Sequence, residues 1–116
     1  MIYIVLIVVA FLIFRKITEP KVTHIDQATL ETYLKDKKKY QFIDVRTSNE
    51  FNSHKLKGFK NMPLQTLNKH LDKLSKDQAI VLLCATGSRS MNAARVLKKA
   101  GFDNLINVKG GLSRMT

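Results

Sequence analysis

AIVLLCATGSRS, residues 79–90, joins an uninterrupted apolar run to the only cysteine of the chain. The five apolar residues from Ala79 to Leu83 predict a central β-strand that is covered on both faces. Cys84 therefore follows the end of a strand, at the carboxyl edge of the predicted sheet. A helix is predicted to begin near Ser88, and its positive end points at Cys84. Such a position favours the thiolate form of a cysteine. Cys84 is therefore the candidate nucleophile.

The loop after Cys84 has the composition of a small anion cradle. Gly87 permits a backbone geometry that other residues resist, and the amides that follow Cys84 can turn inward around an anion. The candidate substrate-binding residues are Ala85, Thr86, Gly87, Ser88, Arg89 and Ser90. Cys84 and Arg89 form a C-x4-R loop, one residue shorter than the C-x5-R loop of protein tyrosine phosphatases. A tighter ring favours a smaller guest, such as one extra sulfur atom, and disfavours phosphatase or arsenate reductase activity.

The rest of the sequence alternates between strand and helix patterns. Strands are predicted over 22–25, 41–45, 79–83 and 105–108, with an extended piece at 61–62. Helices are predicted over 28–35 with Asp26 as N-cap, over 48–52 and over 90–100, with a helical stripe formed by Leu64, Leu67, Leu71 and Leu74. This alternation predicts an α/β domain with a parallel sheet flanked by helices.

Four segments in order resemble the rhodanese family of sulfurtransferases. The first is the C-x-x-G-x-R-S pattern that begins at Cys84. The others are FIDVR (42–46) followed by NEF (49–51), KLKGFKNMPL (55–64) and VKGG (108–111). Together they cover roughly residues 22 to 112, and the resemblance implies the rhodanese-like fold. The family's usual histidine falls on Lys55, so no histidine role is carried over to Lys55 or to His54.

The resemblance also implies a mechanism. The Cys84 thiolate would attack the outer sulfur of a donor such as thiosulfate, and the resulting persulfide would pass its sulfur to cyanide or a thiol. The amides of residues 85 to 89 would hold the terminal sulfur, Arg89 would add positive charge, and Ser88 and Ser90 would donate hydrogen bonds. The alternative is a non-catalytic rhodanese-like module that binds a partner or senses oxidants through Cys84.

Several neighbouring residues have a structural interpretation. Arg89 has the alternative of pairing with a surface carboxylate. Asp44 is expected to accept backbone hydrogen bonds, and Arg46 to pair with Glu50. His24, His54 and His70 are widely spaced and are expected at the surface, so neither a metal site nor a cofactor is predicted.

The charge of the chain bounds its partners. The net charge is +11, and every charged side chain lies from Arg15 onward. Such a domain suits a small anionic sulfur donor, and it is attracted to an anionic membrane surface. No nucleic-acid-binding motif is present, so nucleic acid is not a predicted partner. A single cysteine excludes an internal disulfide and suits the reducing cytoplasm.

The first fourteen residues, MIYIVLIVVAFLIF, carry no charge and are followed by Arg15 and Lys16. We expect a short, uncleaved membrane anchor over 1–17, a linker over 18–21 and the rhodanese-like domain over 22–116. The positive-inside rule then predicts a single-pass protein of the cell membrane, with the catalytic domain on the cytoplasmic side. The alternative is that the apolar segment is a buried strand or helix of the domain itself.

Overall fold

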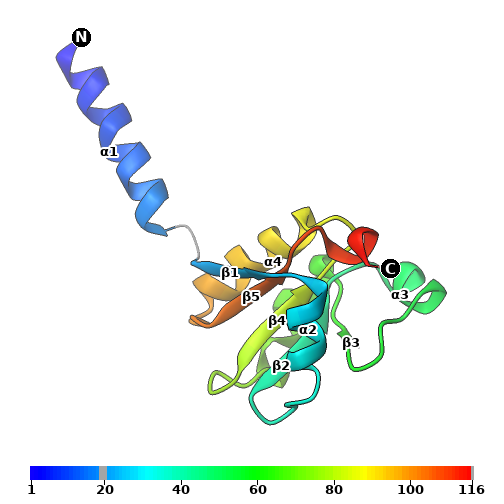
Figure 1. Cartoon of the computed structure of the whole chain (residues 1–116). Coiled ribbons are helices and arrows are strands. Elements are labelled where there is room, and N and C mark those ends of the chain that lie inside the picture. Colours follow the sequence, from blue (N-terminus) through cyan, green and yellow to red (C-terminus); the bar gives the residue numbers. More distant parts are fainter. Residues whose placement is uncertain (19–20, 116) are drawn as a thin grey trace.

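Five parallel strands form the sheet at the centre of the protein (Figure 1). The computed structural model describes residues 1–18 and 21–115, so Glu19 and Pro20 of the predicted linker, and Thr116, lie outside the described residues. The strands are β1 (Val22–Ile25), β2 (Tyr40–Asp44), β3 (Lys60–Asn61), β4 (Ala79–Leu83) and β5 (Leu105–Val108). They lie in the order β1-β5-β4-β2-β3, and every neighbouring pair is parallel.

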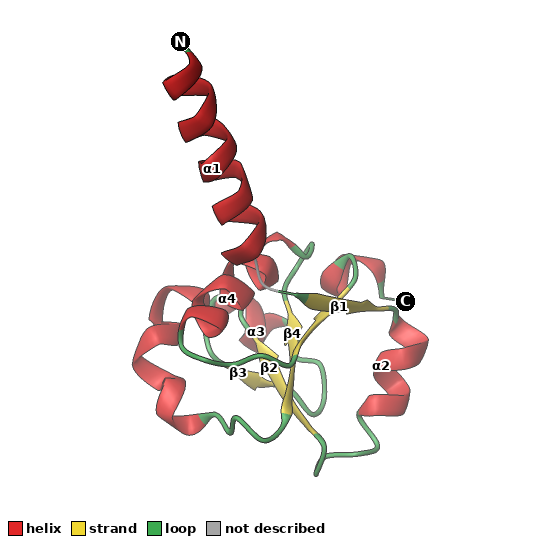
Figure 2. Cartoon of the chain, turned by 90° about the vertical axis from the view of Figure 1, so that its left-hand side faces the viewer, coloured by secondary structure: helices red, strands yellow, loops and turns green. Residues whose placement is uncertain are grey.

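Helices cover both faces of this sheet (Figure 2). The described helices are α1 (Ile2–Thr18), which does not cover the sheet, α2 (Gln27–Tyr33), α3 (Ser48–Ser53) and α4 (Ser88–Lys99), with the 3-10 helices η1 (Leu64–Lys73) and η2 (Gly111–Arg114). One core cluster packs η1 and α4 against the sheet through residues such as Leu67, Leu82 and Leu97. The second cluster packs α2 against the other face, and its members include Leu30, Val81 and Ile106. The predicted parallel α/β sheet flanked by helices is confirmed.

The continuous apolar pattern of β4 has a direct structural cause. All five residues of β4 are buried, because β2 and β5 pair with its two edges and the two core clusters cover its faces. Cys84 follows immediately and belongs to the cluster on the α4 side. The sheet therefore delivers the cysteine to its own carboxyl edge.

The leucine stripe differs from the prediction in helix type. Residues 64–73 form a 3-10 helix, in which Thr66 N donates to Pro63 O at 3.0 Å. Side chains three residues apart lie on one face of a 3-10 helix. The pairs Leu64 with Leu67 and Leu71 with Leu74 have this spacing, and all four leucines reach the core. Pro63 at the N-cap position supplies no side-chain cap that would favour an α-helix. The stripe is core, as its spacing indicates.

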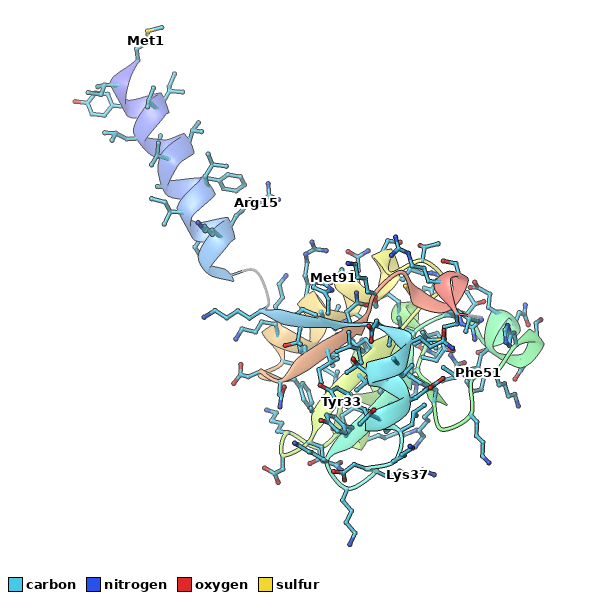
Figure 3. All side chains as sticks on the ribbon, in the orientation of Figure 1. Met1, Arg15, Tyr33, Lys37, Phe51 and Met91 are labelled. Carbon is cyan, nitrogen blue, oxygen red and sulfur yellow. The ribbon has the colours of Figure 1, made fainter. Side chains whose placement is uncertain are left out.

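Helix α1 stands away from the domain (Figures 1 and 3). Every large apolar side chain from Met1 to Phe14 is at least 46% exposed, so the alternative of a buried element of the domain is wrong. The 17 residues of α1 extend about 26 Å, less than the roughly 30 Å of a bilayer's hydrocarbon core. Within the described residues, no helix has both the length and the apolar character needed to cross a membrane. The predicted transmembrane anchor is therefore not supported.

Candidate functional site

The loop from Cys84 to Ser88 connects the central strand to the longest helix of the α/β domain. Gly87 is the N-cap residue of α4 and has a φ of 103°, a left-handed conformation that L side chains rarely adopt. A Cβ atom on Gly87 would find its nearest neighbour, Gly110 N, at 3.7 Å. The requirement for glycine is therefore one of backbone conformation and not of space.

The Cys84 thiol is buried beneath this loop. Its residue is 1% exposed. The backbone N–H of Gly87 donates a hydrogen bond to Sγ at 2.7 Å, and the hydroxyl oxygen of Ser90 lies 3.6 Å from Sγ. The site therefore surrounds the sulfur with a backbone donor and a hydroxyl group at the N-terminus of α4, which is the environment that stabilises a sulfur anion.

The remaining loop residues lie nearer to the solvent. Thr86 and Ser88 are exposed, and their hydroxyl oxygens are 3.5 Å apart. Ala85, Thr86, His54, Leu112 and Ser113 line a shallow hollow of about 290 Å³ beside the loop. A small molecule that approaches the loop from this side meets an apolar floor with a histidine at its edge.

Arg89 is held by a carboxylate from a different element. Its Nη1 and Nη2 atoms lie 2.5 and 2.9 Å from Oε1 and Oε2 of Glu50 on α3. The hydrogen bond from Arg89 lowers the pKa of Glu50 to about 2. The same bond raises the pKa of Arg89. The structure therefore shows Arg89 paired with a carboxylate, that of Glu50.

Arg46 pairs with Asp44 instead of Glu50, so that prediction is wrong. Both side chains are buried, and Nη2 of Arg46 lies 2.8 Å from Oδ2 of Asp44. Asp44 also accepts the backbone N–H of Arg46 at 2.9 Å, as its position at a strand end predicts. The same guanidinium donates to the carbonyl oxygens of Glu50 and His54. Arg46 thereby fixes α3, and with it the partner of Arg89, to the end of β2.

The double-glycine turn supports the loop from the other side. Leu112 N donates to Cys84 O at 2.8 Å, and Ser113 N donates to Ala85 O at 2.9 Å. A Cβ atom on Gly111 would overlap the carbonyl oxygen of Cys84 and lie 2.8 Å from that of Ala85. The VKGG pattern is therefore part of the cysteine site, because only a residue without a side chain allows this approach.

Two residues near the site were missed at the sequence level. Asn107 is a buried amide on β5, and its Oδ1 accepts a hydrogen bond from Ser90 at 2.5 Å. His24 on β1 lies beside Asn107. A polar residue in the apolar run LINV was a usable signal, since buried polar side chains require partners. The pairing of Glu50 with Arg89 had no such signal, because it joins residues 39 positions apart.

Comparison with known proteins agrees with this geometry. The sequence profile of the rhodanese-like domain matches residues 26–116. The chain belongs to the rhodanese-like domain family. The rhodanese-like fold also recurs in a solved rhodanese-like domain protein from Staphylococcus aureus, with a TM-score of 0.71 and 30% identity over 78% of this chain and 88% of that one.

Two curated proteins are similar in sequence to this chain. The thiosulfate sulfurtransferase GlpE of Shewanella oneidensis is 33% identical over 66% of this chain and 75% of its own length. The uncharacterized protein YqhL of Bacillus subtilis is 35% identical over 74% of this chain and 68% of its own length. The family resemblance inferred from the four segments is confirmed.

The part of the chain that the structure describes contains no set of side chains arranged to bind a metal ion. No group of three or more His, Cys, Asp or Glu side chains in residues 1–18 and 21–115 is arranged to hold an ion. The polar groups beside the cysteine sulfur are the N–H of Gly87, which donates to it, and the hydroxyl of Ser90.

Replacing Gly111 by alanine should destabilise the protein through the overlap with the Cys84 carbonyl. Gly101→Ala is the matched control, because Gly101 is also left-handed but its nearest neighbour is the mobile end of Lys76. The conformational cost alone is about 1–2 kcal/mol in each variant. Urea unfolding should therefore give a larger loss for Gly111→Ala, and equal losses would contradict the account.

Glu50→Gln should lower stability in a pH-dependent way. The folded pKa of Glu50 is depressed from 4.5 to about 2, so its contribution is complete above about pH 4.5 and is lost as the pH falls towards 2. Glutamine retains the capping geometry with Thr47 while removing the charge. Urea unfolding at neutral pH and near pH 3 should show a wild-type advantage that shrinks on acidification, and a constant difference would contradict this pairing.

Proposed function

We propose that the protein is a sulfurtransferase that carries a sulfur atom on Cys84, with thiosulfate as a donor and a thiol or cyanide as the acceptor. The observation that carries this proposal is the hydrogen bond from the Gly87 amide to Cys84 Sγ at 2.7 Å. An N–H donor aimed at the sulfur, at the start of a helix, stabilises negative charge there without rearrangement. Membership of the rhodanese-like family and the similarity to GlpE support the same reaction class.

The proposed first step is a displacement at sulfur. The Cys84 thiolate attacks the outer sulfur of thiosulfate, a new S–S bond forms, and the bond to the sulfonate group breaks with release of sulfite. The enzyme is left with a cysteine persulfide. In the second step an acceptor thiolate or cyanide attacks the terminal sulfur, which restores the Cys84 thiolate and releases a persulfide or thiocyanate. Charge is conserved in both steps.

The loop residues have separate roles in this reaction. Gly87 donates its N–H to the sulfur, and the Ser90 hydroxyl lies within reach of the same atom. Arg89 is held in place by Glu50, so its positive charge acts near the loop without closing over the sulfur. Thr86 and Ser88 are exposed at the entrance, where an anionic donor arrives.

A second candidate function is a non-catalytic module that binds a partner or senses oxidants. The burial of Cys84, which is 1% exposed, favours this alternative, because buried cysteines are commonly packing residues. The two functions differ in whether sulfur passes through Cys84. That difference is accessible to kinetics.

Cys84→Ser should abolish thiosulfate-dependent sulfite release, since a hydroxyl cannot accept and return the sulfur atom. The wild type should show parallel double-reciprocal plots against thiosulfate and cyanide, the kinetic pattern of a covalent intermediate. Urea unfolding of both proteins serves as the folding control. Sulfite release by Cys84→Ser would contradict the proposed route, and an inactive, folded wild type would favour the binding module.

The exposed helix α1 calls for a second proposal, about location. We infer that α1 associates with the anionic surface of the cell membrane and keeps the domain on the cytoplasmic side. A helix that is apolar on every face is normally buried in a core or in lipid. Arg15 and Lys16 lie in the last turn of α1, and the chain carries a net charge of +11. Basic residues next to an apolar segment favour anionic lipid.

Vesicle flotation tests the proposed role of α1. The full chain should float with vesicles that contain phosphatidylglycerol, and Ile7→Asp should reduce the floating fraction several-fold because it places a charge among the apolar side chains. Asn104→Asp makes the same charge change on the surface of the domain and is the matched control. A wild type that stays with the soluble fraction, or an Ile7→Asp variant that floats equally well, would contradict the proposal.

A further inference from the structure

Buried polar side chains are few in this protein, and two of them lie behind the nucleophile. Among the described residues, the buried polar and charged side chains are Asp44, Arg46, Ser90 and Asn107. The first two satisfy each other. Ser90 lies beside the sulfur, but Asn107 has no part in the proposed reaction steps. A buried amide costs about 1–3 kcal/mol when one of its hydrogen bonds is missing. The arrangement of Ser90 and Asn107 therefore calls for an explanation.

A continuous hydrogen-bonded chain runs from the cysteine sulfur to the protein surface. Cys84 Sγ lies 3.6 Å from Ser90 Oγ, and Ser90 Oγ lies 2.5 Å from Asn107 Oδ1. Asn107 Nδ2 lies 3.1 Å from Nδ1 of the exposed His24. We call these four residues the sulfur relay.

The sheet explains why the four side chains meet. Asn107 on β5 is in register with His24 on β1 and with Leu82 on β4. Residues two positions apart on a strand share a face, so Leu82 and Cys84 lie on the same side of β4. Ser90 reaches this side from the first turn of α4. The relay therefore crosses three strands beneath α4.

The hydroxyl of Ser90 has one proton and several partners. It is placed to donate to Asn107 Oδ1 at 2.5 Å or to Gly87 O at 2.8 Å, while a Cys84 thiol donates to its oxygen. When Cys84 is an anion, the sulfur needs a donor, and the hydroxyl can supply one only by turning its proton away from Asn107. The vacated oxygen lone pair then needs a donor of its own.

Asparagine is the side chain that can serve both situations. Its amide presents an acceptor on one side and a donor on the other, so a half-turn of the amide brings Nδ2 to Ser90 and Oδ1 to His24. His24 matches either orientation, because its Nδ1 atom accepts a bond when unprotonated and donates one when protonated. A carboxylate at this position could only accept.

We propose that Asn107 is a positioning residue for the nucleophile: through Ser90 it supports both the thiol and the anionic forms of Cys84 by reversing the direction of the sulfur relay. The inference rests on the proposed role of Cys84 as nucleophile. The charged groups around the loop are Arg89 with Glu50 and Arg46 with Asp44, and none of them belongs to the relay.

The test measures the pH dependence of Cys84 alkylation by iodoacetamide in the full chain, which does not require sulfur transfer. Asn107→Asp should raise the pH midpoint of alkylation by about one unit or more, because Ser90 keeps its proton on the carboxylate and a charged hydrogen bond is lost. Asn104→Asp, an exposed change of the same charge, should leave the midpoint unchanged. An unchanged midpoint in a folded Asn107→Asp protein would overturn the proposal.

A double-mutant cycle separates the relay from a direct effect of charge. In a Ser90→Ala background, the relay predicts that Asn107→Asp no longer shifts the midpoint, whereas direct repulsion would persist and overturn the proposal. Asn107→Leu keeps a similar volume and adds no charge, so it replaces Asn107→Asp if the latter does not fold. It should also raise the midpoint, since Ser90 loses its supporting donor, and a wild-type midpoint would overturn the proposal.

The same measurements distinguish this inference from the proposed function. Shifted midpoints in a protein that does not transfer sulfur would leave the relay standing and remove the sulfurtransferase proposal. Unshifted midpoints in a protein that transfers sulfur at the wild-type rate would remove the relay and leave the sulfurtransferase proposal standing.

Discussion

The site depends on the close contact between the double-glycine turn and the backbone of Cys84. Leu112 N and Ser113 N bond to the carbonyl oxygens of Cys84 and Ala85, which fixes the first residues of the loop from outside the sheet. Gly111 makes this approach possible because it has no Cβ. The buried strand β4 holds the residue before Cys84, and α4, whose N-cap residue is Gly87, holds the far end of the loop. A loop held at both ends can present its Gly87 amide to the sulfur at a constant distance.

Charges around the loop are arranged in pairs that join separate elements. Asp44 and Arg46 form a buried pair at the end of β2, and Arg46 also reaches the carbonyl oxygens of α3. Glu50 on α3 then holds Arg89 of α4. The two pairs together connect three elements that converge on Cys84, although the domain as a whole carries excess positive charge. The ion pair between Arg89 and Glu50 is partly exposed, so it contributes little to stability. Its main effect is to hold α3 and α4 in place relative to each other.

The sequence was sufficient for the fold and for the position of the cysteine because these depend on local patterns. The apolar run of β4, the N-cap Asp26 and the left-handed Gly87 each have a signature within a few residues. The partners of Arg46 and Arg89 could not be assigned in this way. Arg46 has carboxylates two and four positions away, at Asp44 and Glu50, and only the folded structure shows that it pairs with Asp44. Arg89 pairs with Glu50, which lies 39 positions away in sequence and is brought near by the fold. Asn107 required the register between β1, β4 and β5, which only the assembled sheet supplies.

The apolar composition of the first fourteen residues predicted a membrane anchor. The helix that contains them, α1, is 17 residues long, and no helix among the described residues is long and apolar enough to cross a membrane. The account of the site itself rests on Cys84 carrying sulfur. Intact mass of the full chain after exposure to thiosulfate tests this most directly. A gain of about 32 Da, removed by cyanide, is the result expected for a cysteine persulfide. An unchanged mass in a folded protein whose Cys84 can be alkylated would contradict it.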